Sequence, residues 1–167
     1  MTSRWTLDFE RHDTPDASAL RRDYYDEVAG RYWRRPATAA EIDEGLADDG
    51  VDLLTPPTGQ FVVGRLDGAP AACGGILMLD AERAELTRVF VRPAFRGTGG
   101  AALLLDALES AARGLGARRM VLNTRLDLVE ARALYTRSGY REIPAYCEGP
   151  YMDIWYGKEL HADALRG

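Results

Sequence analysis

The amino-acid sequence predicts an α/β (α+β) fold: a single mixed, mostly antiparallel sheet of about six to seven strands with helices on both faces. Three observations predict it. The runs at residues 60–66, 70–79 and 84–91 are apolar or alternating, as in strands. The turn Asp67-Gly68 joins the first two of these runs as a hairpin. One helical segment then separates the third of these runs from a fourth strand, which makes that pair of strands parallel.

The N-terminal third is expected to hold a strand and two helices. Residues 5–9 alternate apolar and polar side chains, which is typical of a short strand. Residues 17–33 carry apolar side chains at spacings near four, with Asp16 before them and Pro36 after them, which indicates a helix. A second helix is expected at 38–47, because two aliphatic side chains share one of its faces. A loop rich in glycine and proline follows it.

The C-terminal half is expected to contain helices that alternate with short strands. A glycine-rich turn after the third meander strand introduces a helix at 99–115, which ends at Gly116. The remaining elements are expected as a strand at 119–123, a helix at 129–138 and strands at 141–145 and 150–158.

Length and composition limit the class of protein. The chain has 167 residues, 46% hydrophobic and 28% charged, which predicts one soluble globular domain over residues 1–167. The net charge of −5 argues against a nucleic-acid partner. No run is long enough for a membrane span, so no membrane partner is expected. Cys73 and Cys147 stand far apart without nearby histidines, so we expect no metal site, and a cytoplasmic location is the default expectation.

The segment Arg96-Gly97-Thr98-Gly99-Gly100-Ala101 lies between the third meander strand and the next helix. Its glycines allow a tight turn that brings backbone amides close to a ligand. The helix that follows points its free N–H groups and positive dipole end into the same space, which favours a phosphate group. The alternative is a turn whose glycines serve backbone geometry only. A P-loop is excluded because no Gly-Lys-Ser/Thr is present, and a Rossmann site is disfavoured because Asn123 stands where an acidic residue is expected.

Two motifs together resemble those of the GNAT superfamily of N-acetyltransferases. The first is Leu-Thr-Arg-Val-Phe-Val-Arg-Pro at 86–93 followed by the glycine-rich turn, in which Arg96, Gly99 and Ala101 match the fixed positions of the acetyl-CoA signature. The second is Ala-Arg-Ala-Leu-Tyr-Thr-Arg-Ser-Gly-Tyr at 131–140. The resemblance covers roughly residues 60–160. It implies the acyl-CoA N-acyltransferase fold and acetyl-CoA as cosubstrate.

The resemblance also implies where acetyl-CoA binds. Its pantetheine arm would lie between two splayed parallel strands and pair with the backbone of Val89 and Val91, and its pyrophosphate would lie on the glycine-rich turn. Asn123 could reach the pantetheine, or could serve as a turn residue. The implied cofactor-binding residues are Val89, Phe90, Val91, Arg96, Gly97, Thr98, Gly99, Gly100, Ala101 and Asn123.

The chemistry implied by the resemblance is direct attack of an amine on the thioester in a ternary complex. Tyr135 occupies the position of the residue that donates a proton to the leaving thiolate; the alternative is that it packs on the sheet. Glu85 is a candidate general base, or else a solvent-facing strand residue in an enzyme that uses a water chain. Leu128 stands where many members carry Asn, so one side-chain contact to the cofactor is not expected.

The resemblance also implies that the acceptor lies near the first two helices, their loop and the last hairpin. Two groups of side chains there could select it, and each has a plainer alternative. An acidic run could attract a cationic amine or form a solvated surface, and aromatic residues could line a pocket, pack in the core or form a homodimer contact. The acidic residues are Glu41, Asp43, Glu44, Asp48, Asp49 and Asp52, and the aromatic ones are Tyr24, Tyr25, Tyr32, Trp33, Tyr146, Tyr151 and Trp155.

These observations predict an N-acetyltransferase that moves the acetyl group of acetyl-CoA to a primary amine of a small molecule. Two alternatives use the same fold: a non-catalytic acyl-CoA sensor or scaffold, and an enzyme that acetylates a protein or peptide amine. A nucleotide-binding oxidoreductase is the third alternative.

Overall fold

The structure is a computed structural model that describes residues 4–47 and 49–161. Within them, one seven-stranded sheet has the order β1-β2-β3-β4-β5-β7-β6, and β4 and β5 form its parallel pair. The strands are β1 (Trp5–Phe9), β2 (Gly59–Leu66), β3 (Ala69–Met78), β4 (Arg83–Val91), β5 (Arg119–Thr124), β6 (Arg141–Glu142) and β7 (Ile154–Glu159). The helices are α1 (Pro15–Trp33), α2 (Ala39–Ala47), α3 (Gly100–Gly114) and α4 (Val129–Arg137), with short 3-10 turns η1 (Val51–Leu53) and η2 (Pro93–Phe95). The predicted mixed, mostly antiparallel sheet is confirmed.

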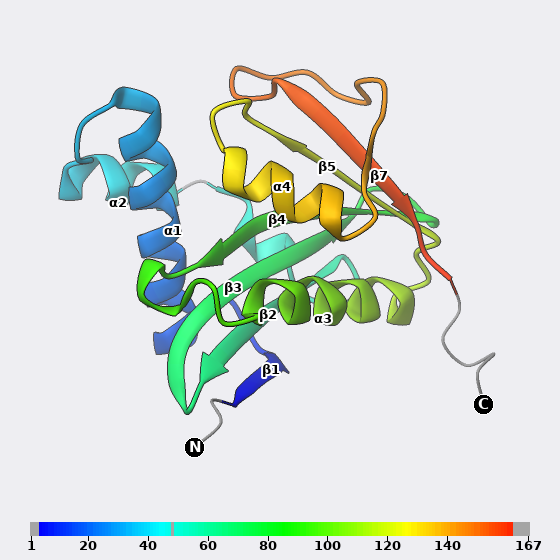
Figure 1. The fold of residues 1–167 in the computed structure, drawn as a ribbon, viewed down its shortest axis with the longest axis horizontal. Coiled ribbons are helices and arrows are strands. Elements are labelled where there is room, and N and C mark those ends of the chain that lie inside the picture. The colour runs from blue at the N-terminus through cyan, green and yellow to red at the C-terminus, as the bar shows by residue number, and fades with distance from the viewer. Residues whose placement is uncertain (1–3, 48, 162–167) are drawn as a thin grey trace.

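The sheet separates two apolar cores (Figure 1). Phe61 and Val63 of β2 pack with Leu20 of α1 on one side. Val62, which lies between them in the strand, packs with Leu104 of α3 on the other side, because successive strand residues face opposite ways. Helix α4 belongs to this second core. The prediction of helices on both faces is therefore confirmed.

The longest helix, α1, begins two residues before the predicted position. Thr14 is its N-cap, and the Thr14 hydroxyl accepts a hydrogen bond from the Ala17 amide at 3.2 Å. Pro15 occupies the first turn, where its missing N–H leaves no helical hydrogen bond unmade. None of the helices in the described part of the chain combines the length and apolar character that a membrane crossing needs.

The last two strands are shorter than predicted. The prediction of a strand at 141–145 is wrong because Pro144 has no N–H to donate, so β6 holds only Arg141 and Glu142. Strand β7 begins at Ile154 rather than at Pro150, since residues 150–151 form a turn.

Strand β4 changes partners along its length, and this opens the sheet. Its first three residues, from Arg83 to Glu85, pair with β5, and the rest pair with β3 alone. The pairing with β3 contains a bulge in which Arg88 and Val89 of β4 stand against the single residue Gly74, and the Arg88 φ of 55° lies in the left-handed region. The bulge bends β4 away from β5, so the two parallel strands diverge after Glu85.

Candidate active site

A cleft of about 670 Å³ occupies the space between the diverging strands. It runs from Glu85, the last β4 residue paired with β5, to the turn before α3. In Figure 1, α4 lies over the gap between β4 and β5, and α1 lies at its open end. Every catalytic and cofactor-binding residue predicted from the sequence lines this cleft except Thr98.

The backbone of β4 presents unpaired groups to the cleft. The Arg92 amide donates to the Ala71 carbonyl of β3 at 2.8 Å. Because strand residues alternate in direction, the amides of Val91 and Val89 point away from β3, toward the cleft. An extended amide-bearing ligand can therefore add to this edge as a further strand would. Phe90, which lies between them, pairs with Cys73 of β3, and its buried ring packs edge-on against Tyr24 at 6.1 Å.

The glycine-rich turn places backbone N–H groups around the end of the cleft. Gly97 and Gly99 have φ values of 76° and 87°, which favour glycine, and a Cβ atom on either would meet open space. In the described chain, the amides of residues 97–99 have no hydrogen-bond acceptor, and α3 begins at Gly100. These amides and the helix dipole make the turn suited to an anion such as a pyrophosphate.

The neighbouring Gly100 and Thr98 have a different role, which sequence reasoning missed. A Cβ atom on Gly100 would lie 2.1 Å from the ring of Trp5, so β1 packs directly under the turn. The Trp5 indole donates to the Thr98 hydroxyl at 3.0 Å, and that hydroxyl donates to the Phe95 carbonyl at 2.7 Å. Trp5 and Thr98 thus hold the turn from below. Because Trp5 lies at the far end of the chain, no local pattern could indicate this contact.

Arg96 is tied to the protein at both sides of its guanidinium. Its Nε donates to the Val91 carbonyl at 2.8 Å, and its Nη2 contacts both carboxylate oxygens of Glu27 at 2.8 and 2.9 Å. Glu27 comes from α1 and also lines the cleft. Arg96 is therefore oriented beside the turn, but part of its charge is already balanced by an acid that the sequence analysis did not single out.

Glu85 lies at the fork where the two strands separate, and two side chains fix it there. The Tyr146 hydroxyl donates to Glu85 Oε2 at 2.7 Å, and the Asn123 amide donates to the same oxygen at 3.3 Å. Burial and the neighbouring Glu85 carboxylate raise the pKa of Tyr146, so its hydroxyl stays a donor. Glu85 is not a solvent-facing residue: it is half-buried and faces the cleft.

Tyr135 lies on α4 and reaches the cleft from the side opposite α1. Its ring is buried beside Tyr140 and Tyr156, at centroid distances of 5.9 and 6.1 Å. Burial raises the pKa of Tyr135, which keeps the hydroxyl protonated. Within residues 4–47 and 49–161 this hydroxyl has no hydrogen-bond partner, so it is free to donate to a ligand in the cleft. At the start of α4, Leu128 lines the cleft and makes no side-chain cap.

Three of the acidic residues between positions 41 and 52 pair with arginines of the same chain. Glu41 pairs with Arg35 at 2.8 Å, Asp43 with Arg22 at 2.6 Å and Asp49 with Arg21 at 3.3 Å. Glu44 is exposed, Asp52 is 95% exposed and lies 3.5 Å from the His12 imidazole, and Asp48 lies outside the described residues. Ion pairing therefore reduces the negative charge that this run can offer to a cationic amine.

The aromatic residues divide between core and cavity wall. Tyr24 packs on Phe90 and also lines the cleft, and Tyr32 packs edge-on against Tyr151 at 4.9 Å. A second cavity of about 270 Å³ beside the cleft is lined by the five tyrosine and tryptophan residues Tyr24, Tyr25, Tyr32, Trp33 and Tyr151. Tyr24 therefore packs against the core and also forms a cavity wall, whereas Tyr32, Trp33 and Tyr151 are exposed and line the cavity without belonging to the core.

Comparison with known proteins gives four informative matches. A family model described as the acetyltransferase (GNAT) family matches residues 15–140. An IAA acetyltransferase from Azospirillum brasilense is 33% identical over 103 residues, which cover 60% of this chain and 65% of that protein.

Solved structures with the same fold include an acetyltransferase from Streptococcus agalactiae, with a TM-score of 0.73, 19% identity and coverage of 93% of this chain and 98% of that one. A GNAT family acetyltransferase from Elizabethkingia anophelis, solved with acetyl-CoA bound, has a TM-score of 0.63, 18% identity and coverage of 93% and 98%.

Proposed function

Because this chain belongs to the GNAT acetyltransferase family, we propose that it transfers the acetyl group of acetyl-CoA to a primary amine of a small molecule, with both substrates bound together. The observation that carries the proposal is the cleft between β4 and β5, which has a carboxylate at its fork and an anion-binding turn at its open end.

The donor side of the cleft fits acetyl-CoA in two places. The amides of residues 97–99 and the start of α3 suit its pyrophosphate, and the amides of Val89 and Val91 suit the pantetheine arm. The Elizabethkingia anophelis neighbour was solved with acetyl-CoA bound, which supports the same ligand here. When bound, acetyl-CoA supplies an activated acyl group as a thioester.

Two side chains are suited to the proton transfers. An alkyl amine is mostly protonated near neutral pH, so Glu85 would take one proton from it, directly or through water, before the nitrogen attacks. As the bond from the acyl carbon to nitrogen forms and the bond to sulfur breaks, Tyr135 would give its proton to the sulfur. The nitrogen would then lose its surplus proton, directly or through water, to the Tyr135 phenolate, which leaves a neutral amide and a neutral thiol. Tyr146 and Asn123 hold Glu85 in place for this task.

Cys73, one of the two cysteines, is unsuited to carry the acyl group as a covalent intermediate. Burial raises the pKa of Cys73 to about 12, so its thiol is a poor nucleophile at neutral pH. Cys73 also packs in the core under α1 rather than lining the cleft. An acyl-cysteine intermediate at this position is therefore disfavoured.

The experiment that tests the proposal is an assay of thiol release from acetyl-CoA across a broad panel of primary amines. We expect release that depends on both the protein and an amine. Binding of acetyl-CoA without release on any amine, small or peptidic, would instead support the sensor alternative. Release with peptide amines alone would contradict the small-molecule acceptor.

A further inference from the structure

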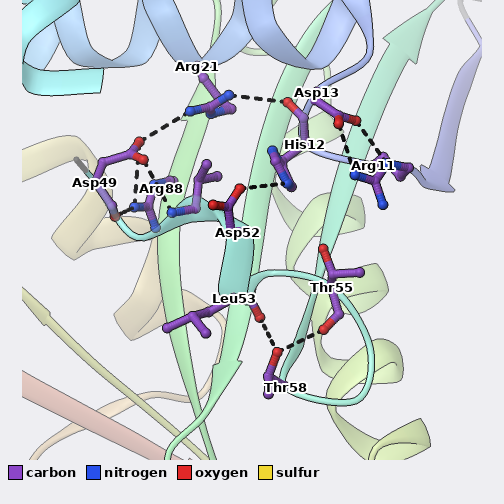
Figure 2. Close-up of polar contacts among 11 residues, drawn as sticks. Arg11, His12, Asp13, Arg21, Asp49, Asp52, Leu53, Thr55, Thr58 and Arg88 are labelled. Carbon is purple, nitrogen blue, oxygen red and sulfur yellow. Dashed lines mark hydrogen bonds and ion pairs between the residues drawn. The ribbon is translucent and has the colours of Figure 1, made fainter. Parts of the chain in front are cut away.

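A smaller cavity of about 210 Å³ opens beside the cleft at the bend of β4. It shares Tyr24, Thr87 and Arg88 with the cleft, so a molecule held there lies next to the proposed site of acyl transfer. The other polar residues that line it are Arg21, Tyr25 and Asp49. The three charged side chains belong to the network drawn in Figure 2.

The charged groups of this cavity do not balance. Arg21 and Arg88 both contact Asp49 Oδ2, at 3.3 and 3.7 Å, and in Figure 2 Asp49 lies between the two guanidiniums. The Arg21 side chain is only 12% exposed, that of Arg88 17% and that of Asp49 15%. Two largely buried cations thus share one carboxylate, which leaves a formal charge of about +1 in a poorly solvated place.

The remaining donors of the two arginines are weakly used. Arg21 Nη1 donates to the His12 carbonyl at 3.3 Å, but the buried Arg21 Nε has no partner within the described chain. Arg88 Nη2 donates to the Asp49 carbonyl, and its Nη1 reaches only the Thr87 hydroxyl, at 3.4 Å. Buried guanidinium donors without partners are costly, and an oxyanion would satisfy them.

Other carboxylates near this cavity are held elsewhere. Asp43 pairs with Arg22, Asp23 with Arg92 and Asp13 with Arg11, at 2.6, 2.8 and 2.9 Å. Asp52 lies beside the His12 imidazole. Among the residues the structure describes, no second carboxylate is positioned to pair with Arg21 and Arg88.

From this geometry we infer that the acceptor amine carries a carboxylate, which Arg21 and Arg88 bind in the small cavity while the amine points toward Glu85. The inference rests on the proposed function and specifies its substrate class: an amino acid rather than a polyamine. A single carboxylate matches the charge of +1, whereas a cationic acceptor would meet two guanidiniums. The ring faces of Tyr24 and Tyr25 would pack against the carbon chain of the acceptor.

The first test compares acceptors that differ only in the carboxylate. Each of a set of α- and ω-amino acids is assayed beside its carboxamide, and thiol release gives kcat/KM for both. We expect the best acceptors to be acids, with kcat/KM at least about tenfold above that of the matched amide. Turnover of amides or polyamines at equal or higher kcat/KM would overturn the inference and leave the acetyltransferase proposal standing.

The second test asks whether Arg21 is responsible for the preference for an amino acid over its carboxamide. In Arg21→Met the cavity becomes neutral, because Asp49 keeps Arg88 as a partner. We expect the preference for the acid to fall to within about threefold, with KM for acetyl-CoA unchanged. Arg22→Met is the matched control, since Arg22 is the next residue of α1 but is 42% exposed and pairs outside the cavity with Asp43.

Arg21→Lys keeps the charge and guards against misfolding as the cause. We expect this variant to retain most of the preference for the acid. A preference that persists unchanged in Arg21→Met would overturn the assignment of the cavity. If acetyl-CoA binds but no amine of either kind is acetylated, the proposed function fails and the inference fails with it.

Discussion

The part of the cleft proposed for acetyl-CoA, the donor side, and the part proposed for the amine, the acceptor side, are built in different ways. On the donor side, residues 96–101 are contiguous, and backbone amides form most of the binding surface. On the acceptor side, Arg21, Asp49 and Arg88 come from α1, the loop before η1 and β4, and their side chains carry the charge. A surface made of backbone suits one constant ligand, whereas a surface made of side chains changes its ligand with a single substitution.

The strongest test of this division lies at Tyr135, which stands between the two sides. Loss of its hydroxyl in Tyr135→Phe should remove the proton donor and lower kcat about 100-fold, while the dissociation constant of acetyl-CoA stays within about twofold. Steady-state kinetics and calorimetry measure the two quantities. Unchanged turnover, with chemistry shown to limit the rate, would remove Tyr135 from the mechanism.

The donor side alone should respond to Arg96→Ala. Loss of this guanidinium beside the turn should weaken acetyl-CoA binding by about 1.5–3 kcal/mol, or about ten- to hundredfold, as for a lost charged hydrogen bond. The acceptor KM should not change. Arg118→Ala is the control, because Arg118 is 79% exposed and does not line the cleft. Equal effects in the two variants would argue against the assigned pyrophosphate site.

Tyr146→Phe should disturb the position of Glu85 at the fork of the cleft without changing the surfaces that bind acetyl-CoA and the amine. The variant loses one hydrogen bond to Glu85, so we expect kcat to fall about tenfold with little change in either KM. If Tyr146 acts by positioning Glu85, adding this substitution to Glu85→Gln should have almost no further effect on kcat. An additive loss in the double variant would show that Tyr146 acts independently of Glu85.

The smallest expected effect comes from Glu27, the acid that already neutralises part of Arg96. Glu27→Gln removes a partly exposed negative charge near the turn, and we expect acetyl-CoA to bind about two- to fivefold more tightly. The gain should shrink as salt is raised, because screening weakens the repulsion. Weaker binding in Glu27→Gln would mean that Glu27 orients Arg96 rather than opposing the ligand.

The sequence predicted the fold well because most strands bury one face or both, and hydrophobic patterning reports that directly. The errors fell at element ends governed by single residues. Thr14 and Pro15 start α1 early through a cap and a proline, and Pro144 ends β6 after two residues. Such ends depend on individual backbone hydrogen bonds, which periodicity does not reveal.

In the candidate site, features that lie in one contiguous segment could be predicted, and features that depend on contacts between distant segments could not. The turn and Tyr135 could be predicted as candidates because each belongs to a short contiguous motif. The roles of Trp5, Glu27 and Tyr146 were missed because each acts on a segment far away in the chain. The acidic run is different, because the sequence did contain a signal for its ion pairs. Several arginines lie along α1, and arginines near an acidic run are typical of ion pairing.

The bend of β4 at Arg88 has a consequence for how specificity could evolve. Its backbone helps to open the groove for the donor, and its side chain supplies charge to the acceptor cavity. A substitution of Arg88 should therefore affect the binding of both substrates, which limits the residues that can replace it. Arg21 contributes only to the acceptor cavity. A substitution at Arg21 should therefore change acceptor specificity without altering the groove for the donor.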